Sequence, residues 1–159
     1  MVQAWCCSLL PAPLSQASGP PGKRGNLTAR RERLVVEQTA CVLQLGDLLE
    51  CAWPAVLSCA ATPFDAVSFK ACLAVVLERG NGHPERLRRL GWARFAAAVR
   101  TELARWGGKR CWWPIVRAVW AALEDPTGVV ALRPGGLERA RLVLADWRAV
   151  GSGWRRWRS

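Results

Sequence analysis

Seven cysteines and one histidine are the side chains of this sequence best suited to metal binding or nucleophilic chemistry. The cysteines form no Cys-x-x-Cys pair and are odd in number, a pattern that fits neither a disulfide framework nor a zinc site. Most of them lie in apolar runs, where a thiol in a reducing compartment acts as a small buried hydrophobic side chain. The single histidine, His83, precedes Pro84 in a polar stretch, which disfavours a hydrolytic triad. We therefore expect no enzyme, no metal site and no cofactor.

The charge and the tryptophan content indicate a protein that binds other molecules. The 159 residues carry a net charge of +11, and ten are tryptophan while none is tyrosine. So strong a positive charge favours an acidic protein partner, nucleic acid or an anionic membrane surface. Tryptophan is favoured where a large ring is anchored in a core or an interface.

The sequence predicts no transmembrane anchor. No apolar run reaches the roughly 18–20 residues that span a bilayer. The apolar run Trp5–Leu10 is preceded by no lysine or arginine and is followed by Pro11 and Pro13, which disfavours a signal peptide.

The apolar residues recur at helical spacing, and no run predicts a strand, so the expected class is all-α. Residues 1–27 are rich in proline, glycine, serine and alanine and predict a flexible arm, and residues 28–159 form the domain. The expected helices cover residues 28–53, 65–79, 91–106, 111–124 and 137–147, with a short apolar segment at 55–61. Glycine at positions 151 and 153 is expected to end the last helix before a basic tail.

One stretch contains the parts of a helix that binds in an apolar groove. It has apolar anchors at helical spacing, a small residue for close approach and an acid at the edge: Val42, Leu45, Gly46, Asp47 and Leu49. Taken alone, such a stretch is more often an ordinary amphipathic core helix.

A second stretch has a tryptophan and an arginine at the start of an apolar helix. Trp92 and Arg94 precede the segment Phe95–Val99. An arginine there lies at a groove mouth and can form a charge-assisted pair with the acid of a partner helix. The alternative is a buried helix that carries one solvated arginine.

A third stretch places aromatic residues around a glycine near the end of the chain: Trp147, Gly153, Trp154 and Trp157. Alone, it favours a basic aromatic tail that binds anionic surfaces.

Together and in this order, the three stretches resemble the third, first and second homology motifs of the Bcl-2 family of apoptosis regulators. The resemblance covers residues 38–159, and the first stretch is most similar to the Bok branch of the family. The sequence departs from the motifs where Gly91 stands for asparagine, Ala93 for glycine, Ser152 for glycine and Trp157 for phenylalanine. The absence of a clear fourth motif and of a membrane anchor suggests a viral homologue or a truncated isoform.

The resemblance implies a Bcl-2-like bundle around the apolar helix at 91–106. It also implies a surface groove for the death-motif helix of a pro-apoptotic partner such as Bax, Bak or a BH-only protein. The groove residues would be Phe69, Cys72, Leu73, Val76, Trp92, Arg94 and Phe95. We expect an inhibitor of apoptosis in the cytoplasm, with peripheral contact to mitochondrial or endoplasmic-reticulum membranes.

Two alternatives stay open. A Bok-like member would promote apoptosis and present the helix around Asp47 as its own ligand. A basic nucleic-acid or anionic-membrane binder would use the arginines at 86–94 and 148–158, although the spread of basic residues along the whole chain counts against this alternative.

Overall fold

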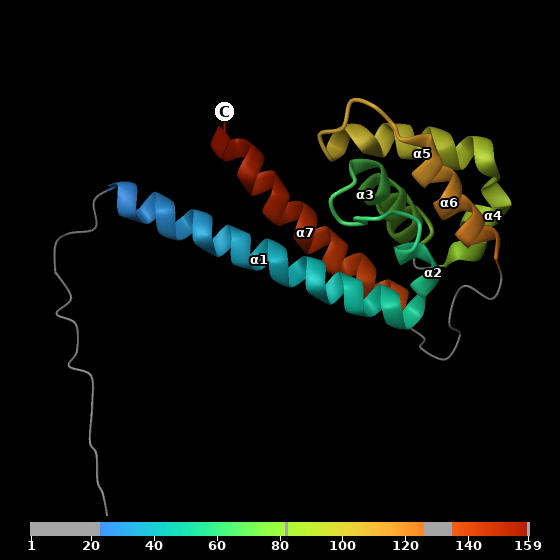
Figure 1. Cartoon of the computed structure of the whole chain (residues 1–159), viewed down its shortest axis with the longest axis horizontal. Coiled ribbons are helices and arrows are strands. Elements are labelled where there is room, and N and C mark those ends of the chain that lie inside the picture. The colour runs from blue at the N-terminus through green and yellow to red at the C-terminus, as the bar shows by residue number, and fades with distance from the viewer. Residues whose placement is uncertain (1–22, 82, 126–134, 159) are drawn as a thin grey trace, which may run out of the picture.

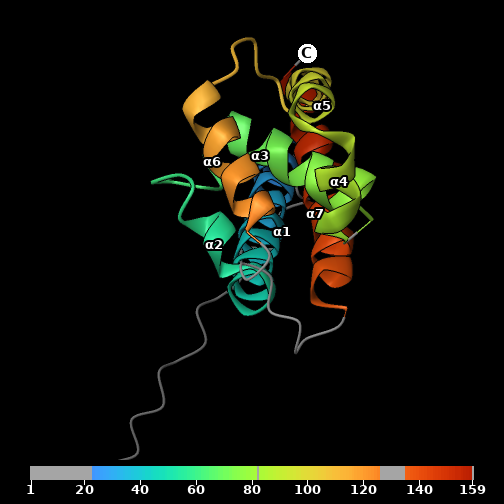
Figure 2. The same cartoon turned by 90° about the vertical axis from the view of Figure 1, so that its right-hand side faces the viewer.

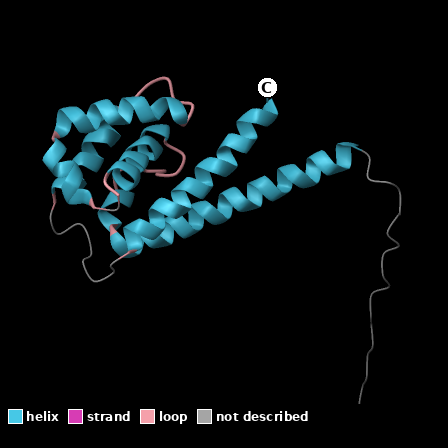
Figure 3. Cartoon of the chain, turned by 180° about the vertical axis from the view of Figure 1, so that it is seen from behind, coloured by secondary structure: helices cyan, strands magenta, loops and turns pink. Residues whose placement is uncertain are grey.

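The computed structural model describes residues 23–81, 83–125 and 135–158, without the side chains of residues 23–26, 84 and 153–158. Within these ranges the chain is helical and has no strand, so the all-α prediction is confirmed (Figure 3). The elements are α1 Lys23–Ala52, α2 Pro54–Leu57, α3 Val67–Ala74, η1 Val75–Arg79, α4 Pro84–Leu90, α5 Trp92–Arg105, α6 Trp113–Glu124 and α7 Gly136–Arg158.

Two long helices, α1 and α7, form one layer of the molecule. They run antiparallel, packed at the end where α1 finishes and α7 begins, and they diverge toward the other end (Figure 1). The approach is close at Gly136, where an added Cβ would lie 2.9 Å from the Cβ of Ala52. Buried Leu49 of α1 and Leu144 of α7 show how the apolar stripes of both helices enter the core.

The central element is the continuous helix formed by α3 and η1. It packs against α5 and α6 on one side, while η1 also packs against α7 (Figure 2). Every residue from Ser68 to Leu77 except Lys70 is buried, as expected of a helix that is covered on most sides. The last turn, η1, widens to π-helical geometry, a feature common at functional sites.

The prediction that helix 91–106 is the central helix is not confirmed by this structure. That helix, α5, buries one face through Phe95, Val99 and Leu103. Its other face exposes Arg94 and Thr101, so α5 is amphipathic and lies at the surface.

The helix boundaries follow the sequence signals except at the two ends of the chain. Proline stands in the first turn of α2, α4 and α6, where its missing N–H costs nothing. Residues 1–22 of the expected arm lie outside the described range, and helix α1 begins at Lys23. The predicted break at Gly151 and Gly153 is also wrong, because α7 continues to Arg158.

None of the described helices is both long enough and apolar enough to cross a membrane.

Candidate functional site

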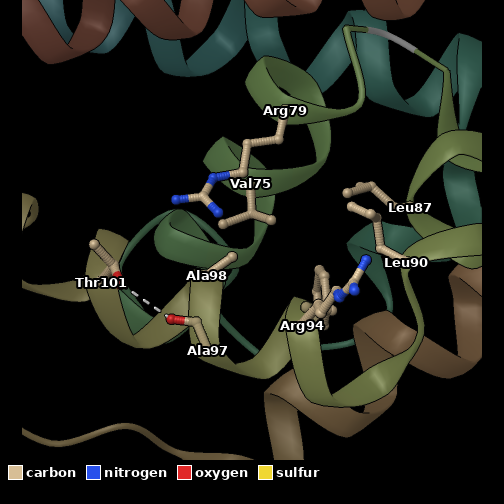
Figure 4. Close-up of a pocket in the computed structure, with 9 residues that line it drawn as sticks. Val75, Arg79, Leu87, Leu90, Arg94, Ala97, Ala98 and Thr101 are labelled. Carbon is tan, nitrogen blue, oxygen red and sulfur yellow. Dashed lines mark hydrogen bonds between the residues drawn. The ribbon is translucent and has the colours of Figure 1, made fainter.

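An apolar pocket lies between η1, α4 and α5 and has a volume of about 340 Å³ (Figure 4). Its lining residues are Val75, Arg79, Leu87, Leu90, Arg94, Phe95, Ala97, Ala98 and Thr101. Most are apolar, and the two arginines are the only charged residues among them. The pocket therefore combines an apolar floor with a positive rim.

Helix α4 forms one wall of the pocket, and Arg88 fixes its position. The Arg88 Nε atom donates to the carbonyl oxygen of Leu123, and Nη2 donates to the carbonyl oxygen of Asp125 at 3.0 Å. These bonds hold α4 against the carboxyl end of α6 and satisfy carbonyls that a helix leaves unpaired there. On the other face of α4, Leu87 is buried and Leu90 is 41 % exposed at the pocket mouth.

The joint between α4 and α5 requires glycine. Gly91 has φ +79° and ψ 162°, a conformation that is essentially restricted to glycine, and it caps both helices. This sharp joint sets α5 as the floor of the pocket, with Phe95 buried beneath it. The hydroxyl of Thr101 donates to the Ala97 carbonyl oxygen at 3.1 Å, so it is already used within the helix (Figure 4).

Arg79 and Arg94 flank the pocket from two different elements. Both side chains are exposed, and Val75 and Ala98 lie between them (Figure 4). Within the described parts of the chain, neither arginine forms an ion pair with a carboxylate. The rim thus carries two positive charges that are not neutralised by described residues, a suitable arrangement for an acidic ligand.

The structure brings together only part of the predicted groove. Of the residues named for that groove, Arg94 and Phe95 line the pocket. By contrast, the predicted α3 and η1 residues Phe69, Cys72, Leu73 and Val76 are at most 1 % exposed and face the interior, so they do not line it.

Trp92 is half-buried and lies outside the pocket. Its ring contacts the rings of Trp113 at 6.3 Å and Trp120 at 6.0 Å between centroids. It therefore acts as part of the packing between α5 and α6.

The pocket residues that sequence reasoning missed come mainly from α4 and from the exposed face of α5. Leu87 and Leu90 are spaced three apart in a segment whose most obvious feature is its arginines. Their helical spacing after a first-turn proline is the signal that indicates this wall. Arg79, Val75 and Thr101 carry no signal of their own, because their use depends on how the helices pack.

The first predicted stretch forms part of α1 and is packed into the core. Leu45 and Leu49 are completely buried, while Val42 is half-buried and Asp47 is exposed. An added Cβ on Gly46 would lie 3.7 Å from the ring of Phe64, which is ordinary contact. The stretch thus serves as a core helix in this structure, with its acid in solvent.

The third predicted stretch is anchored by Trp147. This residue is 3 % exposed, and its ring contacts Trp106 at 5.2 Å and Phe64 at 6.0 Å between centroids. The side chains of Trp154 and Trp157 and the surroundings of Gly153 lie outside the described part of the structure, so the packing of these three residues stays a prediction.

Arg148, next to Trp147, links three elements through ion pairs. Its Nη1 atom lies 2.7 Å from Glu78 Oε1 of η1, and its Nη2 atom lies 2.5 Å from Glu102 Oε1 of α5. Glu102 also pairs with Arg105 at 3.2 Å and its side chain is only 5 % exposed. This network belongs to the structure of the bundle, so the guanidinium of Arg148 is already paired within the described residues.

The cysteines form no metal site in the described ranges, where no cluster of three or more metal-binding side chains occurs. Burial raises the pKa of Cys72 far above the ordinary value for a thiol, and it also raises the pKa of Cys59. Cys51 is exposed. Protonated, buried thiols are poor nucleophiles and poor ligands.

The comparisons with known proteins give no relative. No family model matches the chain, and no match was found to curated proteins or to solved structures.

Proposed function

We propose that the protein is a helix-binding regulator of apoptosis of the Bcl-2 type, and that its pocket receives the death-motif helix of a pro-apoptotic partner. The observation that carries this proposal is the apolar pocket with Arg79 and Arg94 on its rim. The order of the three sequence motifs supplies the choice of family.

The apolar lining of the pocket supports a peptide helix as its ligand. Helix-in-groove recognition uses apolar side chains at helical spacing that enter pockets, and the Bcl-2 family binds its partner helices in this mode. The floor offers Val75, Phe95 and Ala98 to such side chains. Leu90 adds an exposed apolar edge that a bound helix would cover.

The charge of the rim supports an acidic ligand. A death-motif helix carries an aspartate one position after its small residue, and Arg94 stands where the family motif has its arginine. The net charge of +11 attracts an acidic helix before it docks.

Burial of the chain's own motif favours the inhibitory role over the Bok-like role. To act as a ligand, the helix around Asp47 would have to withdraw Leu45 and Leu49 from the core. Each buried leucine stabilises the fold by roughly 1.5–3 kcal/mol, so that exposure is costly. A folded receptor that captures death-motif helices requires no such step.

The test is a titration of the full chain with fluorescently labelled death-motif peptides. We expect saturable binding at micromolar peptide or below, with a modest dependence on salt. Ala97 is exposed and lines the pocket, so Ala97→Phe should fill the pocket and abolish binding. Ala104 is exposed on the same helix outside the pocket, and Ala104→Phe is the matched control that should bind normally. Equal binding by the two variants would refute the pocket as the site.

A further inference from the structure

The loop between α5 and α6 presents an exposed tryptophan beside two cations. Trp112 is 64 % exposed and is the one aromatic side chain in the described ranges that is mostly in solvent. Lys109 and Arg110 precede it by a few residues and are exposed as well. A single exposed apolar side chain needs no explanation by itself, so the surroundings of Trp112 decide its meaning.

The loop is held rigidly on both sides of Trp112. The ring of Trp106 packs on Trp147, and the ring of Trp113 packs on Trp92 with the Arg100 guanidinium 4.8 Å from its centre. The backbone N–H of Trp112 donates to the hydroxyl of buried Ser68 at 2.8 Å.

A close contact with α3 adds to this anchoring. An added Cβ on Gly108 would lie 2.7 Å from the side chain of Val67, so the loop backbone lies directly on α3. The exposure of Trp112 therefore results from a fixed backbone that directs this ring outward while its two tryptophan neighbours are packed.

A second basic, tryptophan-containing segment lies on the same side of the molecule. In Figures 1 and 2 both the α5–α6 loop and the carboxyl end of α7 reach the upper edge of the view. The last turns of α7 have the sequence Trp154-Arg155-Arg156-Trp157-Arg158. The backbones of the two segments thus lie toward the same end of the molecule in both views.

We propose that the loop from Lys109 to Trp112 docks the protein on the surface of an anionic lipid bilayer. The tryptophan ring is amphipathic and is favoured at the level of the lipid headgroups. Lys109 and Arg110 add attraction to anionic lipids, and the positive charge of the whole chain acts in the same sense. The contact is peripheral.

Single-stranded nucleic acid is the other ligand of basic, aromatic surfaces, and the loop geometry disfavours it. Such binding uses several aromatic rings in succession, on which neighbouring bases stack. Here the rings on both sides of Trp112 are occupied by packing.

The experiment is flotation of the full chain with vesicles of phosphatidylcholine, with and without phosphatidylserine. The test variants are Trp112→Ala and the double variant Lys109→Gln with Arg110→Gln. Leu43 on α1 is also 64 % exposed, so Leu43→Ala is the matched control for loss of an exposed apolar side chain. Far-ultraviolet dichroism should show the same helix content for all variants.

We expect the wild-type chain to bind anionic vesicles and Leu43→Ala to bind equally well. Trp112→Ala should weaken binding about tenfold through the lost apolar contact. The double variant should weaken it about 25-fold, or about fivefold per cation, and only on anionic vesicles. No flotation of the wild type, or equal flotation of Trp112→Ala and Leu43→Ala, would overturn the proposal. Tighter binding to a single-stranded oligonucleotide that is lost in Trp112→Ala would also overturn it, since the surface would then be a nucleic-acid site.

Discussion

Replacement of Arg148 by methionine tests the ion-pair network that joins α7 to η1 and α5. Methionine keeps much of the aliphatic stem and removes the guanidinium. Glu102, whose side chain is 5 % exposed, would then keep only Arg105, which is itself 62 % exposed. The pair with Glu78 and the contact of the guanidinium with Trp106, at 5.2 Å from the ring centre, would be lost as well.

The expected loss follows from the burial of Glu102. Removal of one partner from a buried ion pair costs roughly 3–5 kcal/mol, because the other charge stays buried without full compensation. Arg105 remains, so we expect the lower end of that range, about 3 kcal/mol in the free energy of unfolding. Urea unfolding followed by far-ultraviolet circular dichroism measures this value.

Two further variants separate the network from general effects of the substitution. Arg33 pairs with Glu37 at 3.4 Å on the exposed face of α1, and Arg33→Met should change stability by less than about 1 kcal/mol. Adding Glu102→Gln to Arg148→Met should recover part of the lost stability, because the buried charge is then removed. The reasoning is refuted if Arg148→Met lowers the free energy of unfolding no more than Arg33→Met does. It is also refuted if the effects of Arg148→Met and Glu102→Gln on that free energy are additive.

Three other predictions follow from the local geometry. Gly91→Ala should lower the free energy of unfolding by about 1–3 kcal/mol because Gly91 has a φ of +79°. Gly151→Ala should not lower it, because no atom lies within 4 Å of the added Cβ. Thermal unfolding of the two variants measures the difference. In native protein a thiol reagent should modify exposed Cys51 before buried Cys72, and mass mapping that found the reverse order would contradict the burial described here. Burial raises the native pKa of Cys72 and of Cys59 above the unfolded value, so the native state keeps protons that the unfolded chain loses. The free energy of unfolding should therefore fall as pH rises above about 8.5. Urea unfolding at several pH values should show this fall, and a less steep fall in Cys72→Ala.

The sequence predicted the helical class and most helix positions because apolar spacing and proline positions report directly on local structure. The segments at 65–79, 91–106 and 111–124 correspond to α3 with η1, α5 and α6 within two residues at each end. Helix α4, Pro84–Leu90, was not among the expected helices. At the carboxyl end, glycine lowers helix propensity by about 1 kcal/mol without forbidding a helix. There α7 continues, and the Ser152 hydroxyl donates to the Ala149 carbonyl oxygen at 2.7 Å.

The site was predictable only in part, because apolar composition does not say which helix is covered on all sides. Both 67–79 and 91–106 are rich in apolar residues, and burial alone distinguishes the enclosed Phe69 and Val76 from the partly exposed face at Arg94. The arginine could be placed at a rim because it follows the start of an apolar helix. Its neighbours Arg79 and Leu90 come from elements whose approach depends on tertiary packing.

A double-mutant cycle on peptide affinity tests the proposed pairing of Arg94 with the acid of a partner helix. The four affinities are those of the wild-type chain and Arg94→Ala for a death-motif peptide and for the same peptide with its aspartate replaced by alanine. A hydrogen-bonded charge pair contributes about 1.5–3 kcal/mol, so Arg94→Ala should weaken binding by roughly ten-fold to over a hundred-fold. Arg94→Lys should recover only part of this loss because the planar fork is absent. We expect the aspartate substitution to cost little more affinity once Arg94 is gone. Fully additive losses of affinity, or no binding of the wild-type chain at micromolar peptide, would contradict the pairing.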